Sequence, residues 1–248
     1  NRLIADLMMG ISEEAAANGF PLNFFFGLSY KSYAGFIHDN IKNPSSGIIS
    51  YPFQLDQSDN IGALFREYHD AGGKALLLNA PPCQSPILPV LYMDEDAGSR
   101  AAADCLISNR CTRYLVTRAF EARTLAFKKY LSSYDCVDID SPELPELLRR
   151  RQTENERFPI GVFATTDEDA MRCLKHIRDA NMVPGREVRL VGYDDLQLTA
   201  LTDPPLTTVH QPFRHQGRQA VAKLINIIYG NSENDEAIIP FLVKRSTA

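Results

Sequence analysis

The sequence has no tryptophan, no apolar run of the roughly 18 residues that would suggest a membrane-spanning helix, and no long run of lysine or arginine. Its 26 basic residues face 31 acidic ones, giving a formal net charge of -5. Binding to nucleic acid depends on neutralising phosphates, so a basic surface is the first feature to look for. Its absence predicts that this chain does not bind DNA by itself and has no membrane partner.

Chemical motifs are equally scarce. The five cysteines are scattered without a C-x-x-C pair, which argues against a zinc site or a disulfide framework and favours a reducing cytoplasm. The histidines show no metal-ligand spacing, and there is no G-x-S-x-G, P-loop or G-x-G-x-x-G motif. We therefore expect no catalytic residues, no metal and no cofactor, and we do not expect an enzyme.

What the sequence does contain is a regular alternation of short β-branched or aromatic runs with longer helical periods. Such alternation predicts βαβ units, and hence an α/β fold with parallel sheets covered by helices on both faces. The expected helices are 1–18, 32–41, 61–71, 97–109, 121–131, 145–151, 167–180 and 213–229. The expected strands are 22–26, 47–51, 74–78, 90–93, 113–117, 160–164, 188–193, 206–210 and 238–243.

The order of the first elements is unusual, because a doubly wound sheet normally opens with a strand that becomes central. This sequence opens with a helix. A lobe without its central strand would leave backbone groups of both neighbouring strands unpaired, so we expect the whole protein to possess an N-terminal strand before this helix.

Two local patterns bear on a ligand site. Asp167 precedes a helical run and is a suitable N-cap, with acidic residues following in the first turn. Gly192 to Asp195 follow the buried run of the expected strand 188–193, and in open α/β sheets ligands bind beyond the carboxyl ends of the strands.

The stretch 160–224 resembles the LacI/GalR repressor family, through "FATTDEDA", "VPGREVRLVGYDD" and "DPPLTTVHQPFRHQGRQAV", together with the terminal "VKRST". The opening "NRLIADLMMGISEEAAANG" and "LYMDEDAGSRAAADCLI" are also similar to family segments. The resemblance implies two Rossmann-like lobes joined by three crossover strands, as in type I periplasmic binding proteins. The implied lobes are 1–93 plus 213–239 and 94–212 plus 240–248, with hinge residues Met93, Asp94, Gln211 and Pro240.

The same resemblance implies five effector-binding residues in a cleft between the lobes. Asp194 would accept hydrogen bonds from ligand hydroxyls, or would simply cap the following turn. Arg123 would donate from its planar guanidinium, or would be a surface arginine paired with Glu121. Replacing either by alanine should weaken effector binding by about 1.5–3 kcal/mol with little effect on folding.

For the other three candidates, the alternatives to an effector contact are stronger. Asn79 stands where the family usually has aspartate, and it also suits a turn before Pro81. Thr166 stands where many sugar-responsive relatives have asparagine, so no particular sugar is indicated. Phe213 would stack on the ligand or pack in the core at the start of a helix.

The resemblance as a whole predicts the effector-sensing core of a cytoplasmic homodimeric transcriptional regulator. Its effector would be a sugar or related metabolite, with nucleobases left open. It would bind operator DNA only through an N-terminal helix-turn-helix head that is absent from this chain. The alternative is a periplasmic sugar-binding protein of a transport system, which the "DPPLTTVHQP" block and the unpaired cysteines disfavour.

Overall fold

The computed structural model describes residues 2–27, 29–52, 61–80, 88–154 and 159–248. The expected turn at Pro81 therefore lies outside the described residues. The chain divides into two compact units: unit 1 comprises Asn1–Met93 and Pro212–Ile238, and unit 2 comprises Asp94–Gln211 and Ile239–Ala248. The second and third passages between units fall one residue before the positions implied by the family resemblance.

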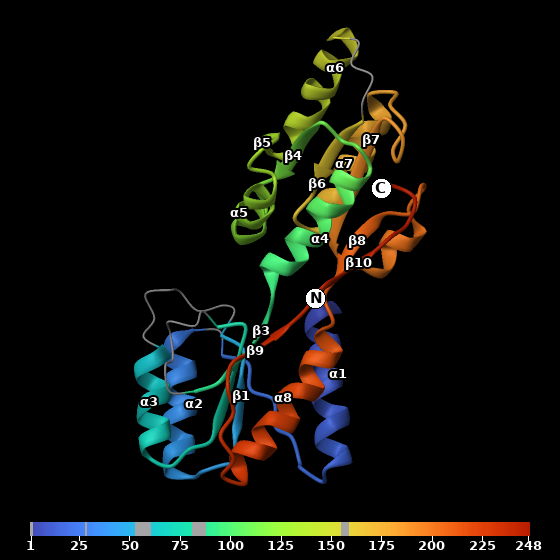
Figure 1. The fold of residues 1–248 in the computed structure, drawn as a ribbon. Coiled ribbons are helices and arrows are strands. Elements are labelled where there is room, and N and C mark those ends of the chain that lie inside the picture. The colour runs from blue at the N-terminus through green and yellow to red at the C-terminus, as the bar shows by residue number, and fades with distance from the viewer. Residues whose placement is uncertain (1, 28, 53–60, 81–87, 155–158) are drawn as a thin grey trace. The chain divides into compact units, whose positions relative to one another are not determined.

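Unit 1 contains a parallel sheet in the order β1-β2-β3-β9, formed by Ile48–Ser50, Ala75–Leu78, Val90–Met93 and Glu236–Ile238. Helices α1 (Arg2–Ala17) and α8 (Phe213–Ile228) lie side by side against the sheet (Figure 1). Helices α2 (Tyr30–Lys42) and α3 (Ile61–Asp70) form a second pair, packed against each other. A β-carbon at Gly10 would overlap the backbone of Arg214, so the close crossing of α1 and α8 requires glycine there.

The strand expected at 22–26 is wrong, because these residues are described but form no ladder. The described strands of unit 1 pair in the order β1-β2-β3-β9, and this segment joins none of them. Its aromatic residues, which favoured a strand, pack differently: the Phe25 ring stacks on Phe36 of α2 with centroids 4.3 Å apart.

Unit 2 contains a six-stranded sheet in the order β10-β8-β7-β6-β4-β5. In chain order its strands are β4 (Arg113–Thr117), β5 (Asp135–Ile139), β6 (Ile160–Phe163), β7 (Val188–Asp194), β8 (Thr207–His210) and β10 (Phe241–Val243). Its helices are α4 (Glu95–Ser108), α5 (Glu121–Tyr130), α6 (Leu144–Glu154) and α7 (Asp167–Asp179), with a 3-10 turn η3 (Gln197–Leu201). Two buried clusters, one around Phe127 and one around Leu144, make its core.

The α/β class with parallel sheets is confirmed, with two corrections of detail. The expected strand 238–243 is two strands in two sheets, because the chain passes from unit 1 to unit 2 after Ile238 and Pro240 has no N–H to donate. Strand β10 pairs antiparallel with β8 at the sheet edge. Strand β5 was not expected, because its mixed sequence DCVDI lacks a continuous apolar run.

Candidate functional site

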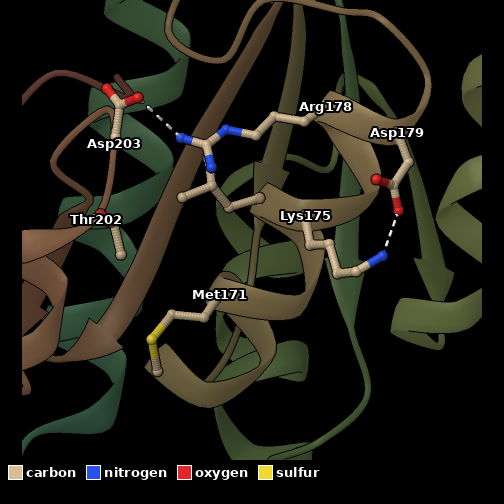
Figure 2. A pocket seen from close by; sticks show the side chains of 7 residues that line it. Met171, Lys175, Arg178, Asp179, Thr202 and Asp203 are labelled. Atoms are coloured by element: carbon tan, nitrogen blue, oxygen red, sulfur yellow. Dashed lines mark hydrogen bonds and ion pairs between the residues drawn. The ribbon is translucent and has the colours of Figure 1, made fainter.

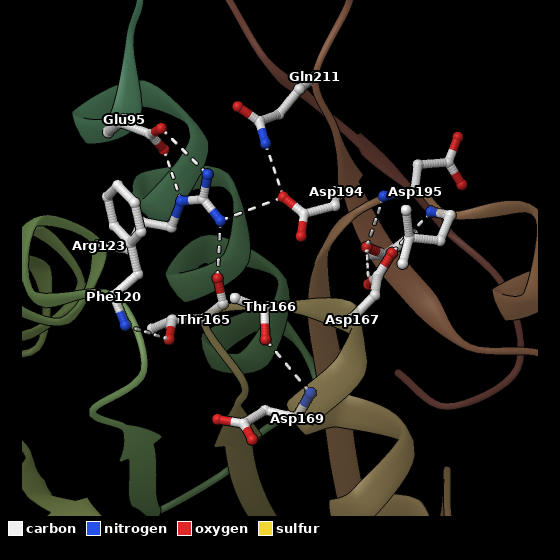
Figure 3. Close-up of polar contacts among 12 residues, drawn as sticks. Glu95, Phe120, Arg123, Thr165, Thr166, Asp167, Asp169, Asp194, Asp195 and Gln211 are labelled. Atoms are coloured by element: carbon white, nitrogen blue, oxygen red, sulfur yellow. Dashed lines mark hydrogen bonds and ion pairs between the residues drawn. The ribbon is translucent and has the colours of Figure 1, made fainter. Parts of the chain in front are cut away.

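A polar cluster in unit 2 forms where parallel strands end (Figure 3). Asp194 is the last residue of β7, Thr165 follows β6, and Phe120 follows β4. Parallel strands present their carboxyl ends at one edge of a sheet, so these loops meet there. Arg123 from the first turns of α5 and Glu95, the first residue of α4, complete the cluster.

Arg123 is the centre of this cluster, and its side chain is only 5% exposed. Its Nε and Nη2 donate to the two carboxylate oxygens of Glu95 at 2.7 and 3.1 Å. Its Nη1 donates to the Thr165 carbonyl at 2.8 Å and to Asp194 Oδ1 at 3.2 Å. Burial alone would lower the pKa of Arg123, but the neighbouring carboxylates hold it above its ordinary value.

Aromatic rings cover the guanidinium of Arg123. The Phe120 ring centroid lies 4.3 Å from its central carbon, and that of Tyr193 lies 3.8 Å away. Such cation–π contacts are stronger in a desolvated site. The Tyr193 ring fits because residue 98 is glycine: a β-carbon on Gly98 would overlap the Tyr193 hydroxyl.

Asp194 is the second member of the central pair, and its backbone is strained. Its φ is 118° and that of Asp195 is 53°, values that residues other than glycine rarely adopt. Gln211 Nε2 donates to its Oδ1 at 2.6 Å, beside the bond from Arg123. Burial raises the pKa of Asp194 to about 6, although Arg123 and Gln211 oppose the rise.

The strained turn is anchored on both sides. Arg245 Nη2 donates to Asp195 Oδ1 at 2.6 Å, and His210 Nδ1 lies 3.0 Å from Asp195 Oδ2. Asp167 is fully buried and accepts from the Leu196 N–H at 2.8 Å. These contacts fix the backbone directly after Asp194, so the position of the Asp194 carboxylate is set by unit 2 itself.

The expected cap of α7 needs a correction. Thr166, not Asp167, is the N-cap: its backbone is extended, and its Oγ1 accepts from the Asp169 N–H at 3.2 Å. Asp167 instead bonds Leu196 and the Thr208 hydroxyl. The expected effector contact of Thr166 stays a prediction.

The structure thus brings Arg123 and Asp194 together in unit 2 and places Asn79 and Phe213 in unit 1. Asn79 has a positive φ of 50° after β2, and its Oδ1 accepts from the Met93 N–H and from Gln216 Nε2. Phe213 is 6% exposed and belongs to the core beneath α1 and α8. The burial of Phe213 is what its core interpretation requires, whereas the Asn79 contacts join residues far apart in sequence and do not test its turn interpretation. The effector roles of both residues stay predictions.

The residues implied as hinges fall at the passages between the units. Met93 ends β3 in unit 1, and Asp94 begins unit 2, where its Oδ1 accepts from the Ala97 N–H as the cap of α4. Gln211 is the last residue of its unit 2 segment, and Pro240 lies between β9 and β10. Their hinge role stays a prediction.

Sequence reasoning missed the contributions of Glu95, Phe120 and Tyr193, and gave Gln211 only a hinge role. The pairing of Arg123 with Glu121 was considered, but the partner is Glu95, 28 positions away. Among the described residues no group of three or more His, Cys, Asp or Glu side chains could hold a metal ion. Nor does any described helix have the length and apolarity needed to cross a membrane.

Comparison with known proteins identifies the class of this chain. Residues 97–248 match the family model of the periplasmic binding protein-like domain, so the chain belongs to that family. Its curated relatives include the lactose operon repressor and PurR repressors, which confirms the resemblance to the LacI/GalR family.

The lactose operon repressor of Escherichia coli (strain K12) is 27% identical over 225 residues, covering 85% of this chain and 61% of the repressor. The chain thus spans about three fifths of that relative's length. A solved lac repressor dimer bound to operator and the anti-inducer ONPF has a TM-score of 0.76 at 19% identity, over 100% of this chain and 90% of that one. The complex of the transcriptional regulator CelR with cellobiose has a TM-score of 0.75 at 19% identity, over 99% and 79%.

Proposed function

We propose that this chain is the effector-sensing core of a LacI/GalR-type transcriptional regulator and that its unit 2 binds a small hydroxyl-bearing ligand, such as a sugar, at Asp194. The observation that carries the proposal is the Arg123–Asp194–Gln211 cluster at the carboxyl end of β7. Ligands of open α/β sheets bind at such strand ends. The repressors among the relatives favour this function over a transport binding protein.

The geometry of Asp194 suits a ligand hydroxyl. Both hydrogen bonds that reach its carboxylate from described residues end on Oδ1. Its Oδ2 therefore retains the capacity to accept, and a carboxylate accepts strongly from hydroxyl donors. Asn79, Thr166 and Phe213 are the further contacts that we propose for the ligand.

Control of transcription requires a DNA-binding segment, and the net charge of -5 does not favour this chain for that role. We propose that a helix-turn-helix head outside this chain binds the operator and that effector and operator affinities are coupled. Such coupling is reciprocal and typically amounts to about 1–3 kcal/mol. Cys105, Cys111, Cys136 and Cys173 are all free, which supports a reducing cytoplasmic location.

We also propose that unit 2 carries a face through which two copies associate. On η3, Leu198 is 60% exposed and Leu201 is 79% exposed. Next to them in sequence, Thr202 lines a groove whose other wall is α7, with Met171 and Leu174 as its apolar part (Figure 2). Exposed apolar patches of this kind mark association sites, and a two-fold dimer would use the same patch on both copies.

The ligand proposal can be tested by a thermal-shift screen of the chain against sugars and nucleosides, because a ligand that binds only the folded state raises the melting temperature. We expect a sugar to stabilise the wild-type chain, and Asp194→Asn to bind it at least about tenfold more weakly. Asp135→Asn removes an exposed aspartate from β5 in the same unit and should bind like the wild type. Failure of every compound, or unchanged binding by Asp194→Asn, would contradict the proposal.

A further inference from the structure

Arg123, at the centre of the site, does not present its Nε and Nη2 edge, the fork of the guanidinium, to a ligand. The Nε and Nη2 edge, which pairs with carboxylates or phosphates in two parallel bonds, is taken by Glu95 at 2.7 and 3.1 Å. The Nη1 group is engaged by the Thr165 carbonyl and Asp194. The hydrogen-bonding capacity of Arg123 is thus almost fully used inside unit 2.

The remaining approaches to Arg123 are covered as well. Phe120 and Tyr193 have ring centroids 4.3 and 3.8 Å from the guanidinium carbon, and the side chain is 5% exposed. An anion could reach this cation only by displacing Glu95, whose own side chain is 24% exposed. The carboxylate of Glu95 therefore occupies the place where a ligand anion would be recognised.

The charge balance points the same way. One guanidinium is paired with two carboxylates, Glu95 and Asp194, so the cluster carries a formal charge of -1. Oδ2 of Asp194 accepts no hydrogen bond from a described residue, and this carboxylate oxygen repels an anion and attracts a donor. Glu95 also stands in the first turn of α4, where an acidic side chain interacts favourably with the helix N-terminus.

We propose that Glu95 is a specificity-determining residue that closes Arg123 to anions, so that the effector is a neutral or cationic hydrogen-bond donor and not a phosphorylated or acidic one. This inference rests on the proposed function, because it concerns the ligand of the same site. The acidic side chain acts as an internal substitute for a ligand carboxylate. Removing its charge should expose the fork of Arg123 and turn the site into an anion receptor.

Sulfate is a suitable probe, because it is doubly charged near neutral pH and needs no knowledge of the effector. Titration calorimetry at constant ionic strength would compare the wild-type chain with Glu95→Gln and Glu95→Ala. Glu143→Gln is the matched control, since it removes an exposed glutamate from another arginine pair in unit 2. Adding Arg123→Lys to each Glu95 variant tests whether the guanidinium fork is the receptor.

We expect no saturable sulfate binding by the wild type or Glu143→Gln. Both Glu95 variants should bind sulfate at least about tenfold more tightly, a difference of ~1.4 kcal/mol, and should lose this gain with Arg123→Lys. The inference is overturned if the wild type binds sulfate as tightly as the Glu95 variants, or if neither folded variant gains affinity. Should neither variant fold, saturable sulfate binding by the wild type that Arg123→Lys abolishes still overturns it.

The sulfate result and the sugar screen can fail independently. A gain of sulfate binding without any sugar ligand would contradict the proposed function and leave the role of Glu95 intact. A sugar that binds through Asp194, with no gain of sulfate affinity in the Glu95 variants, would support the proposed function and refute the proposed role of Glu95. Tighter binding of a sugar acid than of its neutral parent sugar by the wild type would also refute the proposed role of Glu95.

Discussion

Replacing Arg123 by methionine should destabilise unit 2 severely, which differs from the small folding effect expected from sequence. The variant keeps an unbranched apolar chain between the rings of Phe120 and Tyr193 but removes the charge. It deletes the hydrogen bonds to Glu95, Thr165 and Asp194, and it leaves two carboxylates facing each other without a counterion. Removing one partner of a buried ion pair costs about 3–5 kcal/mol.

That cost is a large fraction of the stability of a typical domain, which is about 5–15 kcal/mol. It corresponds to a fall in melting temperature of roughly 6–20 °C for a domain of about this size. Urea unfolding monitored by circular dichroism and a thermal scan would measure it. Arg118→Met is the control, because Arg118 pairs with Asp140 on the surface of the same unit and exposed pairs contribute about 0–1 kcal/mol.

A double-mutant cycle makes the reasoning more specific. In the Arg123→Met background, Glu95→Gln should recover part of the lost stability, since it removes a carboxylate that has become unpaired. In the wild-type background the same change should be destabilising. A cost below about 1 kcal/mol for Arg123→Met, or an equal effect of Glu95→Gln in both backgrounds, would show that the ion pair does not stabilise unit 2.

Three further predictions follow from individual contacts. Gly98→Ala should displace Tyr193 and cost about 1–3 kcal/mol in unfolding free energy together with a loss of effector affinity; wild-type values in both assays would contradict this. Burial raises the pKa of Asp194 to about 6 from an unfolded value near 4, so its carboxyl takes up protons more readily in the folded state. The stability of the wild type relative to Asp194→Asn should therefore fall by about 2 kcal/mol as the pH rises from about 4 to 6, and a constant difference would refute it. Leu201→Asp should convert dimers to monomers in analytical ultracentrifugation, whereas Leu125→Asp, at a leucine of α5 that is 61% exposed, should not.

The order of most elements could be predicted from sequence, because long amphipathic periods and buried β-branched runs carry a strong local signal. The segment 22–26 shows the limit of that signal. Its apolar and aromatic residues suit a strand, but a strand also needs a partner, and this segment pairs with none of the described strands. Strand β5 shows the reverse case, since pairing with β4 makes a strand of a sequence with weak local preference.

Sequence reasoning named both residues of the contact between Arg123 and Asp194, but not the residues around them. Asp194 follows a buried strand, so its position at a strand end could be inferred from local sequence. The partner of Arg123 could not be inferred, because Glu95 comes from another helix and the local alternative, Glu121, was equally plausible by spacing. The overlap between Gly98 and Tyr193 is likewise a tertiary constraint with no sequence signature.

The central claim is that unit 2 recognises its ligand through the carboxylate of Asp194, beside an arginine that Glu95 holds in place. A crystal structure of the chain with the most strongly stabilising sugar from the screen tests it most directly. We expect a ligand hydroxyl within about 2.5–3.0 Å of an Asp194 oxygen, with the Glu95–Arg123 pair intact. A ligand bound elsewhere, or one that displaces Glu95 and pairs with Arg123 itself, would contradict it.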